Sequence, residues 1–344
     1  MHDIALVGAG RIGRIHAANV LIEPRLRLKY VIDPMPAAAR AAAAATGATT
    51  ASMDQALADP VVKGVIVASA TDTHLDYCLC AIEAGKAVFC EKPIDLDLDR
   101  ARAAASTLGG SEIPLLLGFN RRFDPNFSRL RARLASGEMG ELETLHIISH
   151  DPAPPLIDYI GISGGLFRDM AIHDFDMARW LLREEPEAVF ATAACLIDPA
   201  IGAAGDVDTA KTLLRTRSGK LCVISNSRRS GYGYDQRIEA YCERGMIRAD
   251  NVMETMVGTW GHSGSANGPI QNFFLDRYAD AYRAEMKHFA DVIEGSATPL
   301  ATYDDGIAAL AIAEAAVLSA QSRQSEPTRF QRATGVATGV KSRS

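Results

Sequence analysis

The stretch VGAGRIGRIHAANV, from Val7 to Val20, decides the fold of this chain. Its glycines, Gly8, Gly10 and Gly13, have the GxGxxG spacing and stand between an aliphatic run and a segment with helical spacing. In such a strand–turn–helix unit the first glycine permits the tight turn, the second lets a pyrophosphate approach, and the third lets the helix lie close to the sheet. The stretch therefore predicts a dinucleotide site at a helix N-terminus.

An acidic residue at the expected place supports this interpretation. Asp33 ends the next strand-like run, at the distance from Gly13 that the motif requires. A carboxylate there binds the ribose hydroxyls of the adenosine and repels a 2′-phosphate, so the sequence favours NAD over NADP. The alternative is an empty α/β domain in which Asp33 only caps a helix.

The first third of the chain alternates between strand and helix patterns. Aliphatic runs predict strands, and the segments between them have helical periodicity. The predicted strands are 4–7, 26–32, 63–68, 87–90 and 114–118, and the predicted helices are 11–22, 36–46, 74–84 and 98–108. This alternation predicts an α/β Rossmann domain, a doubly wound parallel sheet, over residues 1–119.

The pattern changes after residue 119. A helix is predicted at 127–136 and strands at 142–149, 187–195, 209–217, 220–226 and 236–242. This predicts an α+β domain with a large open, mostly antiparallel sheet over residues 120–300. A helix capped by Asp304 or Asp305 is expected within residues 301–320, and the polar composition of 321–344 predicts a disordered tail.

Strand 220–226 is apolar on both faces, because Leu221 and Val223 alternate with Cys222 and Ile224. A sheet of this kind needs cover on its second face. We therefore expect a second copy of the chain to supply it, in a homodimer or homotetramer.

Composition narrows the function classes. The chain has 344 residues and a formal net charge of -6, which disfavours nucleic-acid binding, and its apolar runs are too short to span a membrane. Its six cysteines form no CxxC pair, so neither a disulfide framework nor a metal site is expected. The start of the chain lacks a secretory signal pattern, which predicts a cytoplasmic protein.

Dehydrogenases remove a hydroxyl proton with zinc, with a Tyr-xxx-Lys pair, or with a set of lysine, histidine and aspartate. No Cys/His cluster has ligand spacing, and no tyrosine is followed four residues later by lysine. The stretch FCEKPID supplies a lysine, Lys92, at the carboxyl end of a predicted parallel strand, where ligands gather. Pro93 is compatible with a cis peptide bond. The alternative is an ordinary solvated lysine.

The stretch SGGLFRDMAIHDFDMARWLL supplies the other two groups. On one predicted helix Asp169, His173 and Asp176 share a face at i, i+4 and i+7, whereas Asp174 points elsewhere. We expect Asp169 to orient His173 and raise its basicity, and Asp176 to bind a substrate hydroxyl. The alternative is a solvated helix face with a chance histidine.

These motifs together resemble the Gfo/Idh/MocA oxidoreductase family over residues 1–320. GAGRIG at 8–13, Asp33, EKP at 91–93 and GGLFRDMAIHDFDMARW at 164–180 carry the resemblance. GFNRRFDPNF at 118–127 and DPAPP at 151–155 are similar, more narrowly, to the bacterial inositol 2-dehydrogenases of this family.

The resemblance implies a Rossmann domain, an open sheet that forms dimers or tetramers, and a C-terminal helix that returns to the first domain. It implies NAD-dependent oxidation of myo-inositol to 2-keto-myo-inositol. Another cyclitol or sugar, such as scyllo-inositol or glucose, and a non-catalytic NAD-binding regulator remain alternatives.

The site residues that follow are grouped by expected role. The catalytic residues are Lys92, Asp169 and His173. The residues expected to bind the cofactor are Gly8, Gly10, Arg11, Ile12, Gly13, Asp33, Ser69, Thr71, His74 and Glu91. The residues expected to bind the substrate are Lys92, Arg122, Asp176 and Tyr234.

Overall fold

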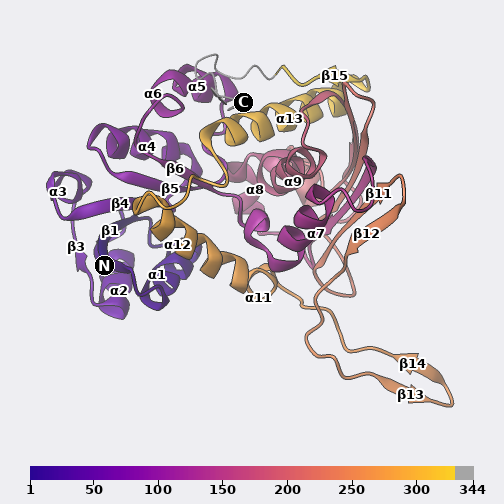
Figure 1. Cartoon of the computed structure of the whole chain (residues 1–344), viewed down its shortest axis with the longest axis horizontal. Coiled ribbons are helices and arrows are strands. Elements are labelled where there is room, and N and C mark those ends of the chain that lie inside the picture. The colour runs from indigo at the N-terminus through magenta and orange to yellow at the C-terminus, as the bar shows by residue number, and fades with distance from the viewer. Residues whose placement is uncertain (330–344) are drawn as a thin grey trace, which may run out of the picture.

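The computed structural model describes residues 1–329 and contains two main sheets joined by helices (Figure 1). The first sheet has six strands in the order β3-β2-β1-β4-β5-β6, and all of its neighbouring pairs are parallel. Its strands are β1 (His2–Val7), β2 (Leu26–Ile32), β3 (Thr49–Thr50), β4 (Val62–Val67), β5 (Ala87–Glu91) and β6 (Leu115–Gly118). The prediction of a doubly wound parallel sheet is confirmed.

The helices of this half connect successive parallel strands. They are α1 (Arg11–Ile22), α2 (Pro36–Thr46), α3 (Met53–Ala58), α4 (His74–Glu83), α5 (Leu98–Ala103) and α6 (Ala105–Leu108). The sequence predicted neither β3 nor α3, and the helix expected over 98–108 is divided at Ala104. Strand order reverses between β1 and β4, so the glycine turn after β1 lies at the switch point where such sheets bind ligands.

The second sheet has seven strands in the order β12-β11-β7-β10-β9-β8-β15. Its strands are β7 (Leu142–His150), β8 (Pro186–Ala194), β9 (Thr209–Thr216), β10 (Leu221–Ser227), β11 (Asp235–Cys242), β12 (Gly245–Ala249) and β15 (Glu326–Pro327). Only the pair of β7 and β10 is parallel, which confirms a mostly antiparallel sheet. Helices α9 (Ile172–Leu182) and α13 (Tyr303–Ser322) pack against it.

The other face of this sheet carries a short apolar row. Phe190, Leu213 and Val223 are cross-strand neighbours on β8, β9 and β10, and their exposed fractions are 41%, 39% and 40%. Cys222 and Ile224 alternate with them and are fully buried. Within residues 1–329 the chain therefore leaves an apolar row of its sheet open to solvent.

The last long helix, α13, connects the two halves. It packs against α9 and β8 and also against α5 and β6 of the first sheet. Its N-cap is Thr302, whose hydroxyl accepts a hydrogen bond from the Asp305 N–H, while the Asp305 carboxylate accepts one from the Thr302 N–H. The expected caps, Asp304 and Asp305, are thus wrong, since Asp305 serves the third helical position of a capping box.

The expected disordered tail is wrong over its first residues. Helix α13 continues to Ser322, and β15 pairs with β8, with Glu326 opposite Val189. The remainder of that expectation, 330–344, lies outside the described residues.

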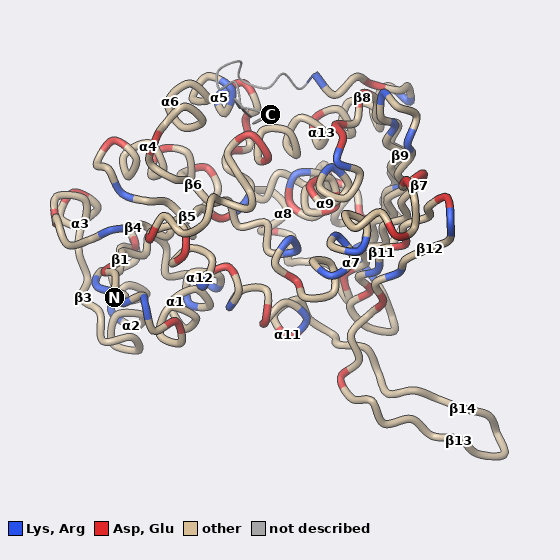
Figure 2. Tube along the Cα trace, viewed as in Figure 1, with Lys and Arg blue, Asp and Glu red and all other residues tan. Residues whose placement is uncertain are grey.

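The remaining elements are short, with one exception. They are α7 (Pro125–Ala135), α8 (Ile157–Ser163), α10 (Pro199–Ala203), α11 (Phe274–Arg277), the hairpin of β13 (Thr259–Gly261) and β14 (Gly264–Ala266), and the unpredicted α12 (Ala279–Ile293). Helix α12 packs on α1 and β5. Figure 2 shows acidic and basic residues interspersed over the body and none on the projecting hairpin. Among residues 1–329, no helix is long and apolar enough to cross a membrane.

Candidate active site

In the glycine turn after β1, packing within the protein requires glycine at Gly8 and Gly13 but not at Gly10. A Cβ atom at Gly8, whose φ is +95°, would lie 2.3 Å from the Ala68 carbonyl oxygen, and one at Gly13 would lie 1.9 Å from the Gly8 carbonyl oxygen. Gly10 has a φ of -69°, and a Cβ atom there would meet no described atom within 4 Å. The absence of a side chain at Gly10 is explained by a ligand that approaches the backbone closely, which fits a pyrophosphate.

Asp33 lies beside this turn at the end of β2. Its Oδ2 accepts a hydrogen bond of 2.6 Å from the Ala9 N–H, and its Oδ1 accepts one of 2.7 Å from the Met35 N–H. These bonds hold the carboxylate next to the glycine turn, where it fits the ribose diol of NAD. Arg11 and Ile12 begin α1 directly after the turn.

The loops that follow β4 and β5 are held together by His74. Its Nδ1 is 2.8 Å from the Pro93 carbonyl oxygen, and its Nε2 is 3.1 Å from the Ser69 carbonyl oxygen. The Lys92–Pro93 peptide bond is cis. His74 is buried, so its part is to join the Ser69 loop to the EKP segment, and Thr71 lies in the short turn between them.

Glu91, expected to bind the cofactor, contacts the helix of the glycine turn. Its carboxylate is buried, and its Oε1 lies 2.6 Å from Nε2 of the fully buried His16 on α1. This contact ties β5 to the helix of the glycine turn. The expected contact of Glu91 with the cofactor stays a prediction.

Lys92 and Asp169 meet between the two halves of the chain. Lys92 Nζ donates to the Asp169 carbonyl oxygen at 2.8 Å and lies 3.3 Å from its Oδ1. Tyr159, on α8, donates its hydroxyl to the same Oδ1 at 3.0 Å. An ammonium group has three N–H donors, so one remains for a substrate oxygen. Sequence reasoning missed Tyr159, because the short α8 has no periodic pattern to reveal it.

The expected single helix through this region is wrong. Asp169 lies in a π-helical turn (Leu166–Met170), and α9 begins at Ile172, so the spacing to His173 is not that of one α-helix. In the described part of the chain, Asp169 makes no hydrogen bond with His173. Asp169 instead positions Lys92.

His173 is kept neutral by its surroundings. Its Nδ1 is buried without a hydrogen-bond partner among the described residues, and its ring packs edge-on against Phe119. Burial, followed by the positive charges of Lys92 and Arg121, holds the pKa of His173 well below its ordinary value. The expectation that Asp169 raises this basicity is therefore wrong. A neutral imidazole is the form that can accept a proton.

Next to His173 in the chain, Asp174 belongs to a buried ion pair that sequence reasoning missed. Asp174, expected to point elsewhere, is fully buried and paired with Arg121. Asn226 donates to the Asp174 carboxylate at 2.7 Å, and Arg121 donates to Ser149 Oγ at 3.1 Å. Burial raises the pKa of Asp174, and the guanidinium of Arg121 opposes this shift. The sequence signal for this pair was the presence of Arg121 in an RR dipeptide and of Asp174 in the stretch that carries His173.

Asp151 and Tyr234 belong to the same polar group. Burial raises the pKa of Asp151 to about 7, with the charges of Asp169 and Asp174 adding to it and Arg228 opposing. Tyr234 is 7% exposed, and burial raises the pKa of its hydroxyl, which Arg121 and Asp151 influence electrostatically. Asp151 had stood out only as part of the DPAPP motif.

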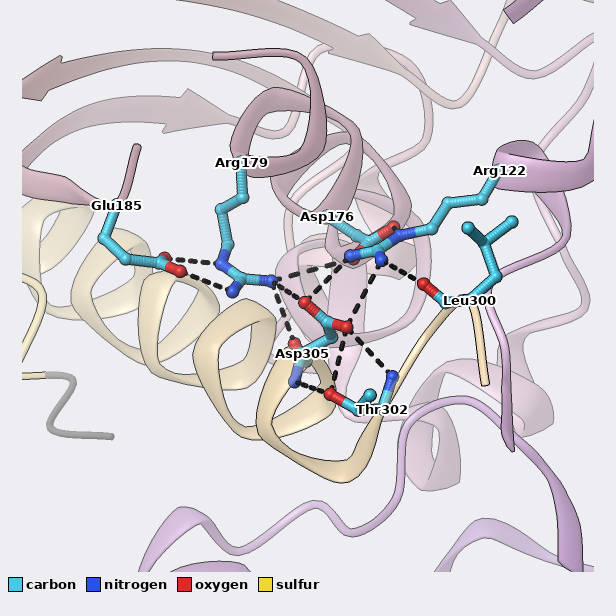
Figure 3. Close-up of polar contacts among 7 residues, drawn as sticks. All are labelled: Arg122, Asp176, Arg179, Glu185, Leu300, Thr302 and Asp305. Carbon is cyan, nitrogen blue, oxygen red and sulfur yellow. Dashed lines mark hydrogen bonds and ion pairs between the residues drawn. The ribbon is translucent and has the colours of Figure 1, made fainter. Parts of the chain in front are cut away.

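Arg122 and Asp176 lie elsewhere than expected (Figure 3). Asp176 is fully buried, and both of its oxygens accept hydrogen bonds from Arg122, at 2.8 Å and 2.5 Å. Arg122 also donates to the Leu300 carbonyl oxygen at 2.7 Å and pairs with Asp305. These contacts fix α9 to the start of α13. The substrate-binding role expected for both residues is therefore corrected to a structural one.

A neutral imidazole beside an ammonium group can take a hydroxyl proton and stabilise the oxygen that loses it. Lys92 follows β5 at the carboxyl edge of a parallel sheet whose first turn fits a dinucleotide, and its charge acts on His173. The fold and the site thus define an oxidoreductase that works with a nicotinamide dinucleotide.

Comparison with known proteins identifies the family. Residues 2–117 match the model of an oxidoreductase family with an NAD-binding Rossmann fold, and residues 127–248 match the GFO/IDH/MocA C-terminal domain. The chain belongs to the Gfo/Idh/MocA family of NAD-binding oxidoreductases.

Individual relatives agree over nearly the full length. An inositol 2-dehydrogenase of Rhizobium meliloti (strain 1021) is 48% identical, over 93% of this chain and 97% of that protein. The structure of a myo-inositol dehydrogenase from Corynebacterium glutamicum superposes with a TM-score of 0.91 at 43% identity, over 95% of this chain and 98% of that one. A scyllo-inositol dehydrogenase from Lactobacillus casei, solved with NAD(H) and scyllo-inositol, gives a TM-score of 0.89 at 26% identity, over 95% and 99%.

Proposed function

We propose that this protein oxidises one secondary hydroxyl of myo-inositol to the ketone of 2-keto-myo-inositol, with reduction of NAD. The observation that carries the proposal is a neutral His173 near the ammonium group of Lys92. Asp169 holds that ammonium group in place by accepting its hydrogen bond. The names of the relatives at 43% to 48% identity support the choice of substrate.

The residues divide the chemistry between them. His173 accepts the hydroxyl proton on its imidazole, and the free N–H of Lys92 hydrogen-bonds to the substrate oxygen as negative charge develops there. Bound NAD supplies the acceptor for the hydride that leaves the same carbon. The turn of Gly8–Gly13 and Asp33 would hold the dinucleotide, and Ser69 and Thr71 lie on the adjoining loop.

The remaining polar groups suit a ring with several hydroxyls. Tyr234 and Asp151 would bind the hydroxyls next to the reacting carbon, since a phenol and a carboxyl group can both accept and donate hydrogen bonds. The buried Arg121–Asp174 ion pair lies near Tyr234 and holds the surrounding elements together. Arg122 and Asp176 take no part in this contact.

One alternative substrate has a specific observation behind it. The Lactobacillus casei neighbour was solved with scyllo-inositol, which differs from myo-inositol only in the orientation of one hydroxyl. The test is NADH formation by the purified protein with myo-inositol, scyllo-inositol, D-chiro-inositol and D-glucose, each with NAD and with NADP. We expect the highest kcat/KM for myo-inositol with NAD.

The outcomes separate the alternatives. A preference for scyllo-inositol would replace the substrate and leave the catalytic groups in place. Equal use of NADP would contradict the role of Asp33. NAD binding without turnover of any polyol in the panel would overturn the proposed activity and favour a regulator.

We further propose that the protein works as a homodimer or homotetramer in the cytoplasm. The row of Phe190, Leu213 and Val223 supports assembly through the open sheet face. All six cysteines are free thiols, four of them buried, which suits a reducing compartment.

A further inference from the structure

A pocket lies at the opposite end of α9 from His173. It has a volume of about 340 Å³ and is formed where the ends of α7 and α9 meet the start of α13. Four arginines line it together with Trp180: Arg122, Arg131, Arg179 and Arg183. Neither the proposed reaction nor the cofactor uses any of these residues.

The acidic residues of the pocket are already engaged (Figure 3). Glu185 receives two hydrogen bonds of 2.6 Å from Arg179, and Asp305 pairs with both Arg179 and Arg122. Glu184 accepts hydrogen bonds from the Ser218 N–H and hydroxyl, at 2.9 Å and 2.5 Å. Glu185 and Asp305 therefore pair with Arg122 and Arg179, whereas Glu184 bonds to Ser218 and to no arginine.

Arg131 and Arg183 lack such partners. Within residues 1–329, neither guanidinium has a carboxylate at ion-pair distance, and Nε of Arg131 is buried without a hydrogen-bond partner. Burial, followed by the charges of Arg183 and Arg122, lowers the pKa of Arg131. The Arg131 guanidinium lies 5.7 Å from the centre of the Trp180 ring, and that of Arg122 lies 5.9 Å from it.

We propose that this pocket binds a phosphate dianion, either inorganic phosphate or the phosphoryl group of a small phosphomonoester. A guanidinium presents paired N–H donors that match two oxygens of a phosphate. Two unpaired guanidiniums, one from α7 and one from the end of α9, require more acceptor oxygens than a single carboxylate offers, whereas a tetrahedral phosphate has enough for both.

Trp180 makes the site observable. The chain has two tryptophans, and the second, Trp260, is 77% exposed on the projecting hairpin. In a Trp260→Phe background, emission reports on the Trp180 ring against which Arg131 lies. Saturating NAD keeps the pyrophosphate-binding turn filled, so that added phosphate cannot act there. Inorganic phosphate is titrated at constant ionic strength, above its second pKa, with chloride as the comparison salt.

The expected result is a saturable change in Trp180 emission with phosphate and none with chloride. Arg131→Gln should weaken the apparent affinity at least about tenfold, the effect of losing a charge-assisted pair. Arg133→Gln is the matched control, because Arg133 lies on the same helix, is 48% exposed and pairs with Glu138. It removes the same charge and should leave the affinity unchanged.

The outcomes decide the proposal. Equal affinities of the Arg131→Gln and Arg133→Gln variants, with matching thermal unfolding, would overturn it. So would the absence of phosphate binding both by emission and by calorimetry. Tighter binding of glycerol phosphate than of inorganic phosphate would assign the pocket to an organic phosphate, and the reverse order would assign it to the free ion. Either order supports the site.

Discussion

At the scale of single residues, Gly10 distinguishes what the fold requires from what the cofactor requires. Replacement of Gly8 or Gly13 places a Cβ atom on backbone atoms, whereas Gly10 has open space. We predict that Gly10→Ala keeps the thermal stability of the protein and weakens NAD binding at least about tenfold, because the added methyl group meets the pyrophosphate.

The measurement is NAD affinity by calorimetry together with thermal unfolding. Gly261→Ala is the matched control, since Gly261 also has open space and lies on the projecting hairpin. Unchanged NAD affinity in Gly10→Ala would show that the dinucleotide does not lie against this backbone.

The lowered pKa of His173 predicts that kcat/KM falls only at unusually acidic pH. Because burial and the nearby cations lower its pKa, the imidazole stays neutral as the pH falls through 6.5, its ordinary value. The base form, and with it kcat/KM, should therefore persist to more acidic pH than an exposed histidine would allow. His173→Ala should reduce kcat by about 10²-fold or more and leave NAD affinity unchanged.

Asp151 must be separated from this effect, because its pKa is about 7. The pH profile is therefore recorded for the native protein and for Asp151→Asn. A limb near pH 7 that disappears in the variant belongs to Asp151. A limb at or above pH 6.5 that remains in Asp151→Asn contradicts the lowered pKa of His173.

The sequence predicted the catalytic residue types but not all of their roles. Lys92 contacts Asp169 and its charge acts on His173, yet Asp169 lies in a π-helical turn and bonds to Lys92 instead of His173. Spacing arguments assume a regular helix, so they cannot detect such a turn. They also could not tell Asp174 from Asp176, because both are buried and each pairs with an arginine from the adjacent RR dipeptide.

At the scale of elements, long periodic segments were predictable and short or interrupted ones were not. The parallel strands follow from aliphatic runs. Strand β3 has only two residues, which is too few for any periodicity. Helix α12 is an exception, since its 15 residues keep helical spacing of the buried side chains and it was nevertheless not predicted.

The attachment of α9 to α13 gives a prediction at this scale. Asp176→Asn leaves Arg122 buried without its full counter-charge, and removal of one partner of a buried pair costs about 3–5 kcal/mol. We expect urea unfolding to show a loss of this size, with little change in the KM of folded enzyme for the polyol.

Asp280→Asn is the control, because Asp280 is 69% exposed and its ion pair with Arg283 lies at the surface. It should change the free energy of unfolding by less than about 1 kcal/mol. A raised KM with native stability in Asp176→Asn would restore the substrate-binding role that the buried network argues against.

At the scale of the whole molecule, the site depends on both sheets. The first supplies the glycine turn, Asp33 and Lys92, and the connection between β7 and β8 of the second supplies Asp151, Asp169 and His173. Helices α12 and α13 return from the end of the chain to pack against the first sheet. The proposed phosphate pocket depends on the same return, since Asp305 at the start of α13 lines it.

The open sheet face makes a prediction about assembly. Leu213 is the middle member of the row that also contains Phe190 and Val223, and a second copy that covers this row would bury apolar surface on both chains. The native protein should therefore be a dimer or larger by light scattering. Leu213→Asp should release monomers of unchanged circular dichroism, because a carboxylate in the centre of such an interface would be desolvated without a partner. Leu21→Asp, at a 56% exposed position on α1, should leave the assembly intact. A native monomer, or a Leu213→Asp variant that still assembles, would place the interface elsewhere.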